Sequence, residues 1–142
     1  MIGSYERPDV RLPGAGGAAE IAVHARRTLV IAKLAPRNFP ERVDFITSPG
    51  HRCDGVSRRE LGLPGAGPVK VITDKAVLEA DPESGELVLA ALYPGVEVGE
   101  VRAGVGWELR ARAALSQVDP PTSRELRLMR EVLDPKGLYL KA

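Results

Sequence analysis

The chain has 142 residues, of which 44% are hydrophobic, a size that suits one domain with a single core. Basic and acidic residues number 20 and 19 and aromatic residues make up 4%, so the composition offers no basic or stacking surface for nucleic acid. A single cysteine, Cys53, excludes an internal disulfide, and the longest apolar run is far shorter than the roughly 20 residues of a membrane-spanning helix. Because the N-terminal segment also lacks the apolar core of a signal peptide, we expect a cytoplasmic protein with neither nucleic-acid nor membrane partners.

A glycine-rich loop follows a polar, proline-broken leading segment at 1–13. Gly14, Gly16 and Gly17 precede an alanine-rich stretch at 17–27 that suits a short buried helix. The start of a helix leaves backbone N–H groups unpaired and carries the positive end of the helix dipole, and glycines let a ligand approach the backbone closely. The loop therefore predicts a site for a negatively charged oxygen.

Other interpretations of this loop stay open. Residues 14–19 match a relaxed dinucleotide fingerprint, G-x-G-x-x-A, but the apolar strand expected at 28–33 ends in Lys33 rather than in an acidic residue that would hold a ribose hydroxyl. NAD binding is therefore not expected, and a tight turn needed only for helix packing remains an alternative. Glu20 lies in the first helical turn, where it either interacts with the helix N-terminus or orients a ligand group.

Strand patterns recur along the chain and are rich in β-branched residues. We expect buried strands at 28–33, 42–47 and 69–73, a hairpin with strands 76–80 and 86–92, and a last strand at 107–110. Pro82 and Gly85 supply the turn chemistry of the hairpin.

Helical patterns alternate with these strands. A short helix is expected at 98–103, and a longer one follows the capping box of Thr122 and Glu125 until Asp134 and Pro135 end it. The alternation predicts the α/β class with a mixed sheet.

Metal-ligating residue types gather at 51–54, where His51, Cys53 and Asp54 lie close in sequence. The chain has only two histidines and one cysteine, whereas a closed zinc site needs four well-placed ligands. Residues two positions apart also rarely face each other well enough for a Cys–His proton transfer. We expect neither a metal site nor a nucleophilic cysteine here.

Several short motifs follow one another in a fixed order. They are 2–5, 11–18, 42–50, 61–65, 71–74, 93–96 and 126–135. In order and spacing they resemble the C-terminal half of the β subunit of family I CoA-transferases, which include glutaconate CoA-transferase. The resemblance implies an α/β fold of the CoA-transferase (NagB/RpiA-like) type, with a mixed, mostly parallel sheet, flanking helices and a β-hairpin. Residues 1–142 would then form one domain.

The same resemblance implies an enzyme that moves CoA from an acyl-CoA to a free carboxylic acid, through acyl-anhydride and glutamyl-CoA intermediates on an enzyme glutamate. The CoA thioester is then a substrate, and no cofactor is bound permanently. In this family the Gly-Gly-Ala loop forms part of the active-site wall. That role falls on Gly14, Gly16, Gly17 and Ala18, to which we add Glu20 from its place in the first turn.

The nucleophilic glutamate of this family sits in a Glu-Ser-Gly or Glu-Asn-Gly motif in the first half of the β subunit, a half that we expect this chain to lack. The Glu-Ser-Gly string at 83–85 lies in the predicted hairpin turn, so Glu83 is not expected to take that role. We therefore expect no catalytic residue on this chain and no activity from it alone.

A lone half of a subunit would leave a sheet edge and apolar surface uncovered, which predicts a homo- or hetero-oligomer. The resemblance implies a CoA-transferase α subunit, a chain supplying the missing half, or both, as partners. A remnant reading frame, a non-catalytic module that binds an anion or CoA, and a part of an acyl-CoA hydrolase stay open as alternatives.

Overall fold

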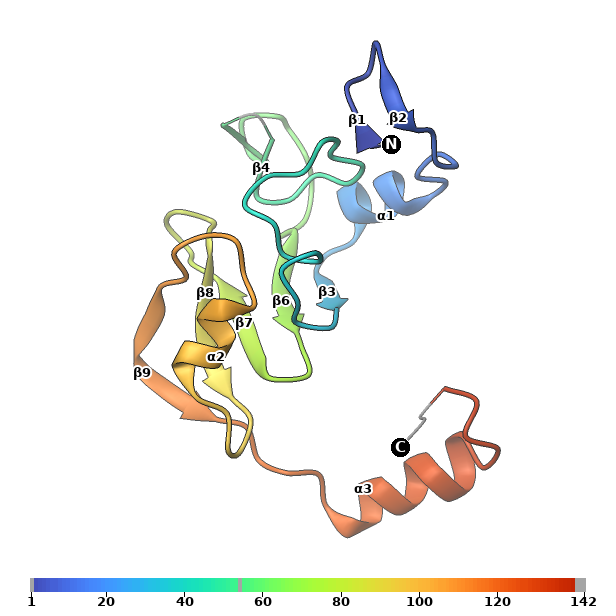
Figure 1. Ribbon diagram of the computed structural model, residues 1–142, viewed down its shortest axis with the longest axis vertical. Coiled ribbons are helices and arrows are strands. Elements are labelled where there is room, and N and C mark those ends of the chain that lie inside the picture. The colour runs from blue at the N-terminus through green and yellow to red at the C-terminus, as the bar shows by residue number, and fades with distance from the viewer. Residues whose placement is uncertain (1, 54, 140–142) are drawn as a thin grey trace.

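The computed structural model of the protein describes residues 2–53 and 55–139. Within them, a five-stranded sheet forms the centre of the molecule (Figure 1). Its strands, in spatial order, are β3 (Thr28–Ile31), β6 (Pro68–Ile72), β7 (Ala76–Ala80), β8 (Leu87–Leu92) and β9 (Ala111–Gln117). The β3–β6 and β8–β9 pairings are parallel, whereas β6, β7 and β8 form an antiparallel meander. The α/β class and the mixed sheet are therefore confirmed, although parallel pairings only equal antiparallel ones in number.

The remaining elements are short. They are the antiparallel pairs β1 (Ile2–Gly3) with β2 (Pro8–Val10) and β4 (Arg52–Cys53) with β5 (Val56–Ser57), the helices α1 (Ala18–His24), α2 (Val98–Ala103) and α3 (Ser123–Arg127), and the π-helical turn η1 (Leu128–Leu133). Figure 1 shows β1, β2 and α1 beyond the β3 edge of the sheet, and α3 and η1 extending away from the other elements. No helix of the described residues is both long and apolar enough to span a membrane.

The hydrophobic core lies between the sheet and the segment that carries α2. Leu78 and Leu89 come from the sheet, and Val101 and Leu109 come from α2 and the segment after it; all four are almost completely buried. Asp74 fixes another part of this layer, because its carboxylate accepts the N–H of Leu34 at 2.7 Å. That hydrogen bond is the main reason that the pKa of Asp74 lies below its ordinary value.

Turn and capping chemistry correctly predicts several elements. The strand at 69–73, the hairpin at 76–80 and 86–92 and the helix at 98–103 are confirmed as β6, β7–β8 and α2. The C-terminal helix is also confirmed: Thr122 and Glu125 form both halves of the capping box. Its last turn widens into η1 before Asp134, whose N–H bonds to the Met129 carbonyl oxygen.

Two predicted strands are wrong. Residues 42–47 form no strand, because they pair with no neighbour; Val43, Phe45 and Ile46 are each about half exposed. Residues 107–110 are not a strand either, since the pairing with β8 extends through 111–117 instead. Leu109 is 1% exposed and packs in the core beneath α2, so it takes part in tertiary packing rather than in a strand.

The burial expected for the first helix and strand is also wrong. None of the residues of α1 is buried, and in β3 Leu29 and Ile31 are 60% and 84% exposed. The physical reason is that β3 is an edge strand that pairs only with β6 among the described strands.

Candidate functional site

The glycine loop lies fully exposed at the start of α1. Gly16 has a φ of +57°, a left-handed conformation that favours glycine, and Gly17 is the residue that precedes the helix. No side chain caps the first turn of α1, and a Cβ built on Gly14, Gly16 or Gly17 would meet no atom within 4 Å. A ligand oxygen can therefore approach these N–H groups directly from solvent.

A groove of about 330 Å³ adjoins this loop. Its walls are Tyr5, Leu12, Pro13, Gly14, Ala15, Phe45, Ile46 and Thr47. The segment at 42–47 reaches the groove because the Asp44 carboxylate accepts the N–H of Gly3 at 3.1 Å. The motifs at 2–5, 11–18 and 42–50 thus meet in space, where apolar walls adjoin backbone donors. Such a surface can hold an acyl chain that ends in a polar group.

The predicted site residues are only partly brought together. Gly14 lines the groove, whereas Gly16, Gly17 and Ala18 continue from its rim into α1. Glu20 is exposed in the first turn, and its carboxylate makes no hydrogen bond or ion pair within the described part of the chain.

Tyr5 and Phe45 are groove residues that the sequence does not predict. The strand pattern places Phe45 in a buried strand, and Tyr5 sits in a polar segment with no motif of its own. An apolar pair, Phe45 and Ile46, directly before the turn at 48–50 is the one signal that points to the groove.

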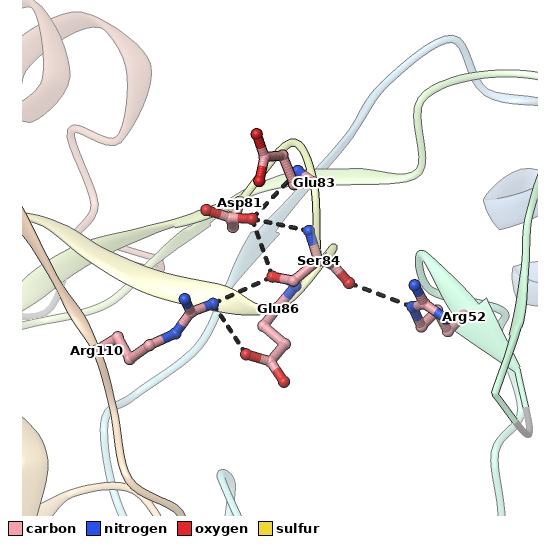
Figure 2. A network of polar contacts seen from close by, with 6 residues as sticks. All are labelled: Arg52, Asp81, Glu83, Ser84, Glu86 and Arg110. Atoms are coloured by element: carbon pink, nitrogen blue, oxygen red, sulfur yellow. Dashed lines mark hydrogen bonds and ion pairs between the residues drawn. The ribbon is translucent and has the colours of Figure 1, made fainter.

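The Glu-Ser-Gly string at 83–85 forms the tip of the β7–β8 hairpin (Figure 2). The Asp81 carboxylate accepts the backbone N–H groups of Ser84 and Glu83 at 2.8 and 3.1 Å and the Ser84 hydroxyl at 2.9 Å. These bonds, that from the Ser84 N–H foremost, hold the pKa of Asp81 below its ordinary value. Asp81 therefore builds the turn.

Two arginines hold the same turn from neighbouring segments. Arg52 donates to the Ser84 carbonyl oxygen at 3.2 Å, and Arg110 donates to the Ser84 hydroxyl at 3.1 Å and to Glu86 at 2.9 Å. The exposed Glu83 carboxylate points away from this network in Figure 2. The geometry supports leaving Glu83 out of the site.

The candidate metal ligands at 51–54 serve other contacts or lie outside the described residues, as Asp54 does. The His51 Nε2 bonds to the Pro68 carbonyl oxygen at 2.5 Å, and Cys53 is a half-buried free thiol. Across residues 2–53 and 55–139, no group of three or more His, Cys, Asp and Glu side chains could hold a metal ion.

Comparison with known proteins identifies clear relatives. The family model described as Coenzyme A transferase matches residues 1–104. The chain is 44% identical over 130 residues to the β subunit of 3-oxoadipate CoA-transferase from Pseudomonas knackmussii, covering 92% of this chain and 50% of that protein. It is 36% identical over 142 residues to the β subunit of glutaconate CoA-transferase from Acidaminococcus fermentans, covering 99% of this chain and 52% of that protein.

Solved structures agree with these matches. The crystal structure of glutaconate coenzyme A-transferase from Acidaminococcus fermentans superposes with a TM-score of 0.83 and 33% identity, covering 99% of this chain and 54% of that chain. Rhodococcus jostii IpdAB superposes with a TM-score of 0.81 and 25% identity, covering 96% and 54%. The chain thus spans about half the length of the curated relatives it matches. Because the family model matches most of its residues, the chain belongs to the coenzyme A transferase family.

Proposed function

We propose that this chain forms part of a CoA-transferase that moves CoA between an acyl-CoA and a carboxylic acid. It would correspond to the C-terminal half of a β subunit, with residues 1–142 as a single domain. The observation that carries the proposal is the similarity to glutaconate CoA-transferase across 99% of the chain with a TM-score of 0.83. The two β-subunit relatives, at 44% and 36% identity, support the same reaction class.

The chemistry would be covalent catalysis by a carboxylate that lies outside this chain. That glutamate attacks the thioester carbonyl, so that CoA leaves as a thiolate and an acyl–glutamyl anhydride forms. The thiolate then attacks the glutamyl carbonyl, which releases the first acid and leaves glutamyl-CoA. The acceptor acid reverses both steps, so CoA ends on the acceptor and the glutamate is restored. The thioester is a substrate, and no permanently bound cofactor takes part.

The glycine loop would supply the substrate wall. Backbone N–H groups of Gly14, Gly16, Gly17 and Ala18 would stabilise the negative charge that develops on the thioester or anhydride oxygen. Their open approach and the missing side-chain cap on α1 support this role. Glu20 would orient a polar group of the substrate or of a neighbouring loop.

The exposed face of β3 supports a partner. Strands in parallel pairings are ordinarily covered on both faces, yet Leu29, Val30 and Ile31 are 60%, 36% and 84% exposed. Ile21 of α1 adds a further side chain that is 67% exposed. We propose that the half of the subunit that the relatives possess beyond this chain covers β3, and that a CoA-transferase α subunit completes a hetero-oligomer. The chain alone would then be inactive.

A hydrolase is the second candidate. Rhodococcus jostii IpdAB superposes nearly as well as the transferase, and the Mycobacterium tuberculosis relative called cholesterol ring-cleaving hydrolase IpdB subunit is 26% identical. In a hydrolase, water would replace the acceptor acid. The higher identity to the transferase subunits favours the transferase.

The test is to capture the tagged chain from its own cells, identify bound polypeptides by intact mass, and assay the eluate with acyl-CoA. Acetate, 3-oxoadipate and glutaconate serve as acceptor acids. Acceptor-dependent CoA exchange together with a co-purifying chain that carries the missing half is the expected result. Release of free CoA without an acceptor would favour the hydrolase. A chain that stays monomeric at micromolar concentration and turns nothing over would be a remnant or a non-catalytic module.

A further inference from the structure

We propose that Arg58 is a positioning residue that fixes α1, and with it the glycine loop, relative to the sheet. The inference rests on the proposed function, because the loop is the substrate wall in that proposal. Arg58 directly follows β5 and is only 6% exposed. None of the ion pairs found in the described residues involves it. Its buried charge must therefore be stabilised by other groups.

Those groups are backbone carbonyl oxygens from three separate segments. The Arg58 Nη2 donates to Ala22 and Val23 at 3.1 and 3.0 Å and to Pro64 at 2.8 Å. Its Nη1 donates to Pro49 and Gly50, both at 3.2 Å. A planar guanidinium with several fixed donors is the one side chain suited to bridge three segments at once.

The helix contact is placed where a cation is most effective. Ala22 and Val23 lie in the last turn of α1, whose carbonyl groups lack partners within the helix and carry the negative end of its dipole. The Arg58 guanidinium thus caps the C-terminus of α1 with a full positive charge.

The other end of this junction is rigid backbone. A Cβ on Gly65 would clash with the carbonyl oxygen of Ala25, so the turn there packs directly against the residue after α1. The N–H of Ala66 donates to Arg26 and the N–H of Thr28 to Gly67, both at 2.9 Å. The C-terminal end of α1 is therefore held to the turn that leads into β6.

Nothing comparable holds the helix by its side chains, because α1 has no buried residue. Its direction is therefore set at its C-terminal end, by Arg58 and the backbone beside it. The glycine loop begins at the opposite end of the same seven-residue helix, so a rotation permitted at Arg58 would displace the loop.

The experiment uses the complex recovered with the tagged chain and compares Arg58→Lys with wild type. Lysine keeps the charge but cannot reach three segments with fixed geometry. Arg59→Lys is the matched control, since Arg59 is the next residue, is exposed, and its side chain makes no hydrogen bond in the described part of the chain. Amide hydrogen exchange is followed in 14–24 and, as an internal reference, in β7 and β8. Steady-state CoA exchange gives kcat and KM for the acyl-CoA.

For Arg58→Lys we expect exchange in 14–24 to become about tenfold faster while β7 and β8 stay unchanged. We expect kcat to fall about tenfold with less than about a threefold change in KM, because a displaced loop loses contacts made in the transition state. Unchanged exchange in 14–24, an unchanged kcat, or the same losses in Arg59→Lys would overturn the inference. If the wild-type complex transfers no CoA, the proposed function fails, while the exchange data still decide whether Arg58 anchors α1.

Discussion

Gly106 packs directly against the backbone of Glu41, so closely that a Cβ on Gly106 would lie 2.6 Å from the Glu41 nitrogen. The Gly106 N–H donates to the Phe39 carbonyl oxygen at 2.8 Å. Phe39 is itself buried, and its ring lies 6.4 Å from that of Trp107. Backbone contact of this kind leaves no room for a side chain, because the opposing atoms cannot rotate away as a flexible side chain can.

We therefore expect Gly106→Ala to lower the free energy of unfolding in urea by about 1 to 3 kcal/mol, the usual cost of overpacking. Gly99→Ala is the matched control, because Gly99 is in α2 with no atom within 4 Å of its Cβ position. That change should raise the free energy of unfolding by about 0.5 to 1 kcal/mol. Equal effects of the two substitutions would contradict the packing argument.

Glu79 makes stability depend on acid pH. Its carboxylate lies 2.8 Å from Lys70 and 2.7 Å from Arg112, and the bond to Lys70 is the main cause of a folded-state pKa below the ordinary 4.5. A lowered pKa stabilises the fold above the unfolded-state value, and this contribution is lost as pH falls through the folded-state pKa. The difference in unfolding free energy between wild type and Glu79→Gln should thus be present at neutral pH and shrink in acid.

Glu86→Gln serves as the comparison for Glu79. Glu86 pairs with Arg110 at 2.9 Å, but both side chains are more than half exposed, so solvent weakens the pair. A pH-dependent loss as large for Glu86→Gln as for Glu79→Gln would argue against a special role for the Glu79 pairs.

The N-terminus of α3 depends on its capping box. The Thr122 hydroxyl accepts the Glu125 N–H at 3.3 Å, and the Glu125 carboxylate accepts the Thr122 N–H at 2.8 Å. Thr122→Ala should cost about 1 kcal/mol of local helix stability, which is about a fivefold faster hydrogen exchange in 123–133. Ser123→Ala removes a hydroxyl at the next position and should leave exchange nearly unchanged; equal acceleration would show that the box is unimportant.

Gly16→Ala tests the glycine loop. Gly16 and Gly137 share a left-handed φ, +57° and +61°, and in both cases a Cβ would meet no atom within 4 Å. Alanine at either position should cost about 1 to 2 kcal/mol of backbone strain. Only Gly16→Ala should also lower the rate of CoA exchange by the complex, by about tenfold. A similar loss in Gly137→Ala would separate the activity from the loop.

Glu83 should be dispensable despite its Glu-Ser-Gly context, because it lies at an exposed hairpin tip. We expect Glu83→Gln to keep CoA exchange within about twofold of wild type, whereas loss of a nucleophile costs roughly ten-thousandfold or more. Peptide mass spectrometry after incubation with acyl-CoA should find no adduct on Glu83. An adduct there would reverse the assignment.

Local chemistry explains which elements the sequence revealed. The tip of the β7–β8 hairpin is built by Asp81 on its own neighbours, and α2 begins at a capping box of Glu97 and Glu100, so residues a few positions apart determine both. The segment at 42–47 has an equally good strand pattern but finds no strand to pair with, and periodicity cannot report a missing neighbour.

The candidate site divides in the same way. The glycine loop is readable from composition, because the left-handed Gly16 and the start of α1 are local properties. The groove residues Tyr5 and Phe45 and the anchor Arg58 depend on contacts across 36 or more positions, such as that of Gly3 with Asp44 or of Arg58 with Ala22. Long-range contacts of this kind leave no periodic trace in one sequence.

The exposed β3 edge also has a consequence for assembly. A strand whose apolar side chains are covered only after a partner binds contributes little to the stability of the free chain, so its burial adds to the stability of the complex instead. The melting temperature should then rise with the concentration of the partner, by mass action. Until that partner arrives, the unpaired edge is open to other strands, and production of both partners together should limit aggregation.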